Sequence, residues 1–189
     1  FVANYGDGGR DSDAMFVDEY MLRNYWLRPF EAAVKRGGAR SVMAAYNSLN
    51  GLPAHQNHWL LTELLREEWG FNGFTVADYN GWLVGRWHNT VPDFDATFEA
   101  VFEAGLNVPL HRSIQHLERV VALVESGELP EELIDRRVRE VLATKYAIGL
   151  FDQPFIDEER LVEVTRAPEH LALADRAYEQ SQVLLKNDG

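Results

Sequence analysis

Residues 73–81, GFTVADYNG, contain a short apolar run that ends on an acidic residue, and the fold can be worked out from this stretch. The run 73–77 has the length and composition of a buried strand in a parallel sheet. It leads directly into Asp78, which is followed by residues typical of a loop. Two similar runs, SVMAAY at 41–46 and LNVPL at 106–110, predict further strands. The sequence therefore predicts a series of buried strands, one of which places an aspartate at its carboxyl end.

Helical segments alternate with these strands. Apolar residues three, four and seven positions apart predict a helix within 12–35, which the glycine pair at 37–38 ends. Residues 151–165 show no clear periodicity, so we expect a connecting loop there. Further helices are predicted at about 59–69, at 95–104, from 114, from 130 and at 168–181. This alternation indicates a parallel sheet covered by helices, either open and doubly wound or closed into a barrel.

The composition narrows the classes of function. The 189 residues suffice for one domain or a large piece of one. A formal net charge of -12 repels a phosphate backbone, so neither nucleic acid nor an anionic membrane is expected as a partner. Because the chain has no cysteine, it has no disulfide, thiolate nucleophile or thiolate metal site. A neutral substrate is favoured, and neither a metal nor a cofactor is predicted.

The position of Asp78 suggests a role in catalysis. In a closed barrel of parallel strands, the active site lies at the carboxyl ends of the strands, which is where Asp78 is expected. Position alone leaves two alternatives open, a solvated loop aspartate and a helix cap. The residues around Asp78 bear on this choice.

Several motifs around Asp78 resemble those of glycoside hydrolase family 3. They are SVMAAYN at 41–47, NGLPAHQN at 50–57, LLT at 60–62 and WGFNGFTVADY at 69–79. Members of this family include retaining β-glucosidases and β-xylosidases, and the aspartate in the last motif is their nucleophile. The resemblance therefore implies an α/β fold, a portion of a (β/α)8 TIM-type barrel, with Asp78 as the nucleophile.

The resemblance covers nearly the whole chain. FVAN at 1–4 is similar to the continuation of a Lys-His-Phe motif, and VLLKNDG at 183–189 is similar to the beginning of the family's second domain. Barrels of this type typically have about 250 residues, so the resemblance implies a fragment. We expect the later part of the barrel at 1–150, an interdomain connection and helix at 151–182, and the start of a second α/β domain at 183–189.

Three more residues match family positions that contact the substrate. Met43 and Tyr46 fall where relatives line the pocket for the non-reducing-end sugar. Tyr79 falls where relatives often carry tryptophan in the pocket wall. The alternative for Met43 and Tyr46 is an ordinary place in the core, because buried Met and Tyr pack more often than they bind ligands.

The roles of four other residues stay open at this level. His55 lies in a loop that resembles the family's, where a structural role is an alternative, and Trp87 follows the Asp78 loop, where it could border the pocket or pack. Arg10 lies in a glycine-rich loop and could approach substrate hydroxyls or form an ion pair. Asn107 stands where many relatives have an acid, a departure that bears on the substrate more than on the chemistry.

The implied reaction needs a partner for Asp78. Retaining hydrolysis uses two carboxyl groups roughly 5 to 5.5 Å apart, one as nucleophile and one as acid/base. In the family's glucosidases the acid/base is generally a glutamate of the second domain, so we expect this chain alone to be inactive.

We therefore expect a retaining, exo-acting β-glycosidase that acts on terminal β-linked glucose or xylose. Its expected partners are a carbohydrate substrate and the remainder of its own chain. Two alternatives are a non-catalytic carbohydrate-binding barrel and a β-N-acetylhexosaminidase of the same family. A metal-dependent hydrolase is not favoured, because the six histidines show no convincing ligand motif.

Overall fold

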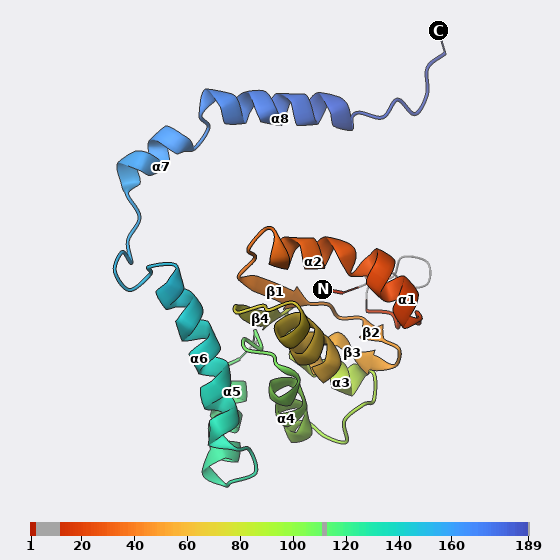
Figure 1. Ribbon diagram of the computed structural model, residues 1–189, viewed down its shortest axis with the longest axis vertical. Coiled ribbons are helices and arrows are strands. Elements are labelled where there is room, and N and C mark those ends of the chain that lie inside the picture. The colour runs from red at the N-terminus through yellow and green to blue at the C-terminus, as the bar shows by residue number, and fades with distance from the viewer. Residues whose placement is uncertain (3–11, 111–112, 189) are drawn as a thin grey trace. The chain divides into compact units, whose positions relative to one another are not determined.

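The computed structural model describes residues 1–2, 12–110 and 113–188 (Figure 1). The chain divides into two compact units, Phe1–Ile148 and Gly149–Gly189. The first unit contains the strands and the helices up to α6. The second contains α7 (Glu158–Val164) and α8 (Pro168–Ser181), whose residues are mostly exposed.

The central feature of the first unit is a parallel pair of strands. Strand β1 (Ser41–Ala44) pairs with β4 (Phe74–Ala77), in a register that sets Ala44 opposite Ala77. Beyond β4, Val108 forms a parallel bridge with Val76, and the amide of Ala77 donates to the carbonyl of Val108 at 2.8 Å. β1, β4 and the bridge at Val108 therefore follow one another along the chain with helical segments between them, as the alternation of strands and helices predicts.

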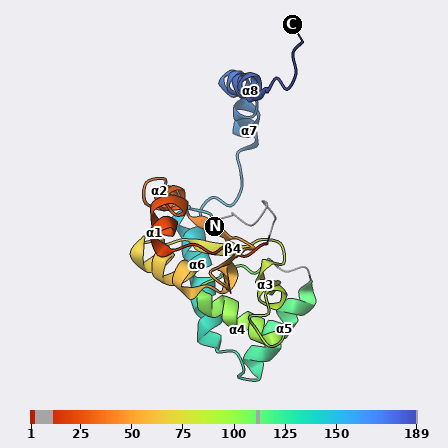
Figure 2. The ribbon, with the colours of Figure 1, turned by 90° about the vertical axis from the view of Figure 1, so that its right-hand side faces the viewer.

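Helices and short strands surround this pair (Figures 1 and 2). In chain order they are α1 (Glu19–Met21), the π-helical η2 (Leu22–Trp26), α2 (Arg28–Lys35), β2 (Ser48–Leu49), β3 (Leu52–Pro53), the 3-10 helix η3 (Ala54–Gln56), the π-helical η4 (Trp59–Glu68), the 3-10 helix η5 (Gly81–Leu83), α3 (Val84–Trp87), α4 (Asp95–Ala104), α5 (Ile114–Glu125) and α6 (Glu131–Ala147). Helix α4 packs against η3, η4, η5 and α6. The bounds of α4 and α8 agree with those predicted from the sequence.

The predicted helix within 12–35 is wrong at its beginning. The amide of Met15 donates to the carbonyl of Ser48, and Met15 bridges Leu49, so this part of the chain is extended. The helix begins only at Glu19, where the side chain of Asp18 accepts a hydrogen bond from a backbone amide of the first turn. An apolar spacing that fits a helix was thus overridden by pairing with a segment distant in sequence.

Two other expectations also need correction. The predicted strand at 106–110 is reduced to the bridge at Val108, because Pro109 has no amide hydrogen to donate and Leu110 has a positive φ of 49°. The predicted loop at 151–165 contains α7. Asp157 caps that helix by accepting hydrogen bonds from two backbone amides, and acidic residues in its first turn suit the helix dipole.

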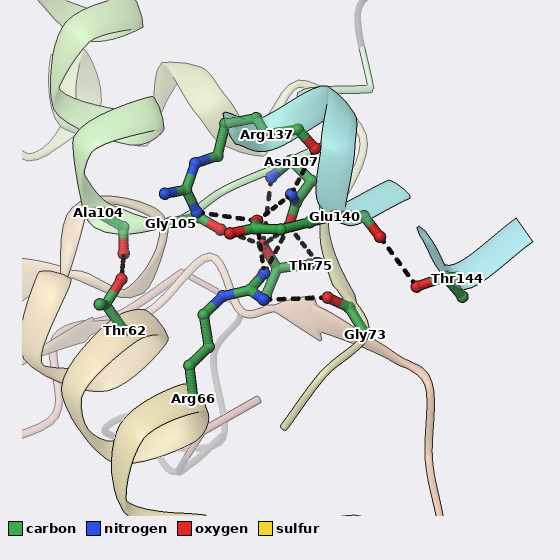
Figure 3. Close-up of polar contacts among 10 residues, drawn as sticks. All are labelled: Thr62, Arg66, Gly73, Thr75, Ala104, Gly105, Asn107, Arg137, Glu140 and Thr144. Atoms are coloured by element: carbon green, nitrogen blue, oxygen red, sulfur yellow. Dashed lines mark hydrogen bonds and ion pairs between the residues drawn. The ribbon is translucent and has the colours of Figure 1, made fainter. Parts of the chain in front are cut away.

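A buried polar network lies beside strand β4 (Figure 3). The side-chain oxygen of Asn107 accepts hydrogen bonds from Arg66 and from the backbone amide of Thr75, each at 2.8 Å. Its side-chain nitrogen donates to the Arg137 carbonyl at 2.9 Å and to Glu140 at 2.5 Å. Asn107 therefore connects β4 to η4 and α6, and it uses both ends of its amide to do so.

The charges in this network explain why an amide fits at position 107. One carboxylate oxygen of Glu140 lies 3.0 Å from the guanidinium groups of both Arg66 and Arg137. Burial lowers the pKa of each guanidinium, and Glu140 opposes that shift. The Arg137 carbonyl and the Glu140 carboxylate beside Asn107 are both acceptors and need a hydrogen-bond donor. A carboxylate at position 107 would place an oxygen against these oxygens.

We predict that Asn107→Asp lowers the unfolding free energy by about 2 kcal/mol or more at neutral pH, because it sets a second carboxylate against Glu140 and a carbonyl. Denaturant unfolding of the intact protein measures this change. The control is Asn72→Asp at an exposed position, which should stay within about 0.5 kcal/mol of wild type. Equal or greater stability of Asn107→Asp would contradict this account of the network.

Candidate active site

Asp78 directly follows β4 and begins a tight turn. The amide of Gly81 donates to the Asp78 carbonyl at 2.7 Å, and Asn80 within the turn has a positive φ of 55°, which asparagine tolerates better than most residues. The amide of Tyr79 donates to Oδ1 of Asp78 at 2.5 Å. The half-buried carboxylate is thus oriented by the backbone of its own turn.

Tyr46 connects the end of the neighbouring strand to this turn. It lies two residues beyond β1, and its hydroxyl donates to the Tyr79 carbonyl at 2.5 Å. Because Ala44 pairs with Ala77, the residues that follow the two strands emerge at the same end of the sheet. The structure therefore brings together three of the residues singled out from the sequence, Asp78, Tyr79 and Tyr46.

Met43 is placed differently. It lies on β1 opposite Val76, and its side chain is half exposed, not enclosed in the core. It lines an apolar cavity of about 240 Å³ together with Phe1 and Phe30. Asp78 and the two tyrosines are not among the residues that line this cavity.

Two aromatic residues left open by the sequence lie near the ring of Tyr46. The ring of His55 is 6.3 Å from that of Tyr46, and the ring of Trp87 is 5.9 Å away. His55 has no exposed surface, whereas Trp87 and Tyr79 are each 53% exposed. The sequence signal for Trp87 was only its closeness to Asp78 along the chain. Tyr46, Tyr79 and Trp87 thus present aromatic surface near the carboxylate.

His55 is uncharged at neutral pH. Burial lowers its pKa from the ordinary value of 6.5 to about 4, and the charge of Asp78 and the carbonyl of Ala45 only partly oppose this shift. Neither ring nitrogen makes a hydrogen bond of ordinary geometry within the described part of the chain. The imidazole is therefore a neutral ring enclosed by protein.

The segment after the turn is anchored by aromatic packing. Trp82 of η5 is fully buried and stacks on Phe98 of α4, with ring centroids 4.7 Å apart. Phe94 and His116 contact the same indole at 5.2 and 4.9 Å. This cluster fixes η5, and hence the end of the Asp78 turn, against α4.

Other kinds of site are not seen in the described regions. Among residues 1–2, 12–110 and 113–188, no cluster of three or more His, Asp or Glu side chains is arranged to hold a metal ion. Over the same residues, no helix combines the length and apolar character needed to cross a bilayer. Arg10 lies outside the described residues.

Comparison with known sequences identifies the family of this chain. The sequence pattern of the glycosyl hydrolase family 3 N terminal domain matches residues 1–144. The chain belongs to glycoside hydrolase family 3. The resemblance inferred from the motifs around Asp78 is therefore confirmed.

Related proteins extend this assignment. The family 3 chain is 35% identical to a beta-xylosidase of Formosa agariphila, over 97% of this chain and 27% of that protein. A solved β-glucosidase from Erythrobacter marinus superposes with a TM-score of 0.87 at 32% identity, covering 100% of this chain and 25% of that one. A β-glucosidase from Listeria innocua, solved in complex with glucose, superposes with a TM-score of 0.71 at 29% identity, over 79% of this chain and 20% of that one.

These comparisons establish the fold class and the extent of the match. Parallel strands alternating with helices, shared with family 3 β-glucosidases, identify the chain as part of a TIM-type barrel. The chain spans about a quarter of the length of the relatives that it matches.

We predict that His55 makes stability depend on pH. Between pH 6.5 and about 4 the unfolded imidazole binds a proton that the folded one does not, so the unfolding free energy falls as the pH is lowered through this window. The loss amounts to roughly 3 kcal/mol, from about 1.4 kcal/mol for each unit of pKa shift. Denaturant unfolding of the intact protein at a series of pH values measures it.

His55→Gln removes the titrating ring and should flatten this component of the pH profile. The control is His58→Gln, which alters a half-exposed ring and should leave the fall in stability attributed to His55 in place. A His55→Gln profile parallel to that of wild type would contradict the prediction.

Proposed function

We propose that the protein containing this chain is a retaining, exo-acting β-glycosidase that cleaves terminal β-linked glucose or xylose, with Asp78 as its nucleophile. The observation that carries this proposal is the placement of Asp78. In a chain of family 3, its carboxylate stands at the carboxyl end of a barrel strand and is oriented by the turn that it begins. The names of the relatives support β-glucosides and β-xylosides as substrates.

The hydrogen bonding of Asp78 suits nucleophilic attack. Oδ1 accepts the Tyr79 amide, while Oδ2 makes no hydrogen bond within the described residues. Oδ2 would attack the anomeric carbon and form an ester to the sugar as the glycosidic oxygen departs with a proton from the acid/base. Water, deprotonated by that same group, would then cleave the ester and release the sugar with its original configuration.

The acid/base is proposed to come from outside this chain. The chain spans about a quarter of its relatives' length, so most of a comparable protein's carboxylates lie elsewhere. We propose that this chain supplies the nucleophile and part of the sugar pocket and that it is inactive alone.

The aromatic residues near Asp78 suit a sugar ligand. A pyranose ring has an apolar face that packs well on aromatic rings, and its hydroxyls bind polar groups at the edge of the pocket. Tyr46 would act mainly by holding the Tyr79 carbonyl, and Tyr79 would offer its exposed ring as a wall. Met43 is proposed to contribute from β1 to the pocket for the terminal sugar.

Covalent labelling tests the assignment of Asp78. The intact protein, incubated with a 2-fluoro glycoside that accumulates the glycosyl-enzyme, should carry the label on the peptide that contains Asp78, as mass spectrometry would show. Label on another carboxylate would overturn the assignment. The absence of label and of turnover across a panel of nitrophenyl β-glycosides, N-acetylglucosaminide included, would favour a non-catalytic sugar-binding barrel.

Asp78→Ala should lower kcat by several orders of magnitude, because the covalent step is lost. Added azide should restore turnover and give the α-glycosyl azide, since a small anion can attack from the face that the carboxylate occupied. The control is Asp135→Ala, at an exposed position on α6, which should retain wild-type rates. Near-normal hydrolysis by Asp78→Ala would exclude it as the nucleophile.

Tyr46→Phe should lower kcat/KM about 10- to 100-fold, because the Tyr79 carbonyl loses its partner and the nucleophile turn loosens. Steady-state kinetics on nitrophenyl β-glucoside and β-xyloside measure this change. Tyr25→Phe removes a hydroxyl from an exposed ring on η2 and serves as the matched control. Unchanged kinetics of Tyr46→Phe would show that its hydrogen bond does not matter for catalysis.

A further inference from the structure

The turn that carries Asp78 lies directly against the ring of His55. A methyl group added at Gly81 would lie 2.2 Å from Nε2 and 2.6 Å from Cε1 of His55, far closer than real carbon atoms approach. Gly81 does not have a positive φ, so its backbone conformation would accept any residue. Position 81 therefore requires glycine because the imidazole occupies the space a side chain would need.

His55 cannot readily move away from this contact. It belongs to the short helix η3, whose residues are all buried and which packs against η4, η5, α3 and α4. The amide of Ala54 in the same helix donates to the Asn47 carbonyl at 3.0 Å. Since close-packed interiors transmit displacement instead of absorbing it, strain at this contact would fall on the turn.

The same ring contacts the second part of the site. Tyr46 lies with its ring 6.3 Å from that of His55, at an angle of 31°. Gly81 is hydrogen-bonded to the Asp78 carbonyl at 2.7 Å, and Tyr46 is hydrogen-bonded to the Tyr79 carbonyl at 2.5 Å. One imidazole thus lies against both Gly81 and Tyr46, the two residues that donate to the backbone carbonyls of Asp78 and Tyr79.

We propose that His55 is a positioning residue for the nucleophile, whose ring sets the location of the Asp78 turn through its contacts with Gly81 and Tyr46. This inference rests on the proposed function of Asp78. The ring acts by its shape. Its low pKa keeps it uncharged at neutral pH, and its enclosed nitrogens exclude it from direct contact with substrate.

A double-mutant cycle in the intact protein tests this role. Gly81→Ala should lower kcat about 100-fold with KM changed less than about threefold, because the carboxylate is displaced while the rest of the sugar pocket stays in place. His55→Ala should lower kcat about tenfold, because the turn loses its support. The double variant should regain at least about tenfold over Gly81→Ala, because removing the ring makes room for the new methyl group.

The matched control is Gly85→Ala. A methyl group there would lie 1.8 Å from Nε2 of Gln56, so it introduces similar crowding against the next residue of η3. It should lower stability with a smaller effect on kcat, and His55→Ala should not rescue it. Unfolding free energies of all variants, and the rate at which a 2-fluoro glycoside labels Asp78, separate loss of folded protein from displacement of the nucleophile.

The outcomes distinguish this inference from the function on which it rests. If wild type is labelled at Asp78 but Gly81→Ala and His55→Ala act additively, the positioning role is overturned while the nucleophile stands. If Gly81→Ala does not fold, the test becomes the rate at which a 2-fluoro glycoside labels Asp78 in His55→Ala. A rate equal to that of wild type overturns the proposal. If wild type is not labelled at Asp78, the proposed function fails, and the positioning role fails with it.

Discussion

The in-register pairing of β1 with β4 is the constraint on which the rest of the first unit depends. Because Ala44 lies opposite Ala77, the chain leaves both strands at the same level and on the same edge of the sheet. The hydroxyl of Tyr46 can then donate to the carbonyl of Tyr79, the residue that follows Asp78. A shift of the pairing by one residue would turn the side chains of one strand to the other face and separate these groups.

The position of β4 is in turn fixed from several sides. Beside the strand, Asn107 accepts the Thr75 amide and ties the strand to charged residues of η4 and α6. Beyond its carboxyl end, Trp82 stacks on Phe98 and holds η5 against α4. The hydrogen bonds of Asn107 are polar and directional, whereas the packing of Trp82 is apolar and extends over a broad area. They hold opposite ends of the segment that carries Asp78. The proposed role of Asp78 as nucleophile would need its carboxylate held to within a fraction of an ångström, and support at both ends of the segment suits that need.

The sequence predicted those features that depend on local patterns. The apolar runs that end near Tyr46 and Asp78 gave the strands, and the helices at 95–104 and 168–181 followed from periodicity and start signals. The beginning of α1 could not be found in this way, because Met15 is extended by pairing with Leu49, far along the chain. The burial of His55 was also hidden. A histidine in a loop motif gives no sign that it will be buried, because its burial depends on a distant glycine that leaves room for the ring.

The burial of His55 also bears on the reactivity of Asp78. An imidazolium beside a carboxylate would pair with it, and a paired carboxylate is a weaker nucleophile because its charge is already compensated. In water, a histidine this close to an acid would gain affinity for a proton. Burial has the opposite and larger effect here, which lowers the pKa of the ring to about 4. No salt bridge to Asp78 is present within the described residues, and a neutral His55 does not form one, which suits the nucleophilic role proposed for this carboxylate. Under the proposed positioning role, the same burial that lets the ring support the turn also prevents it from neutralising the carboxylate.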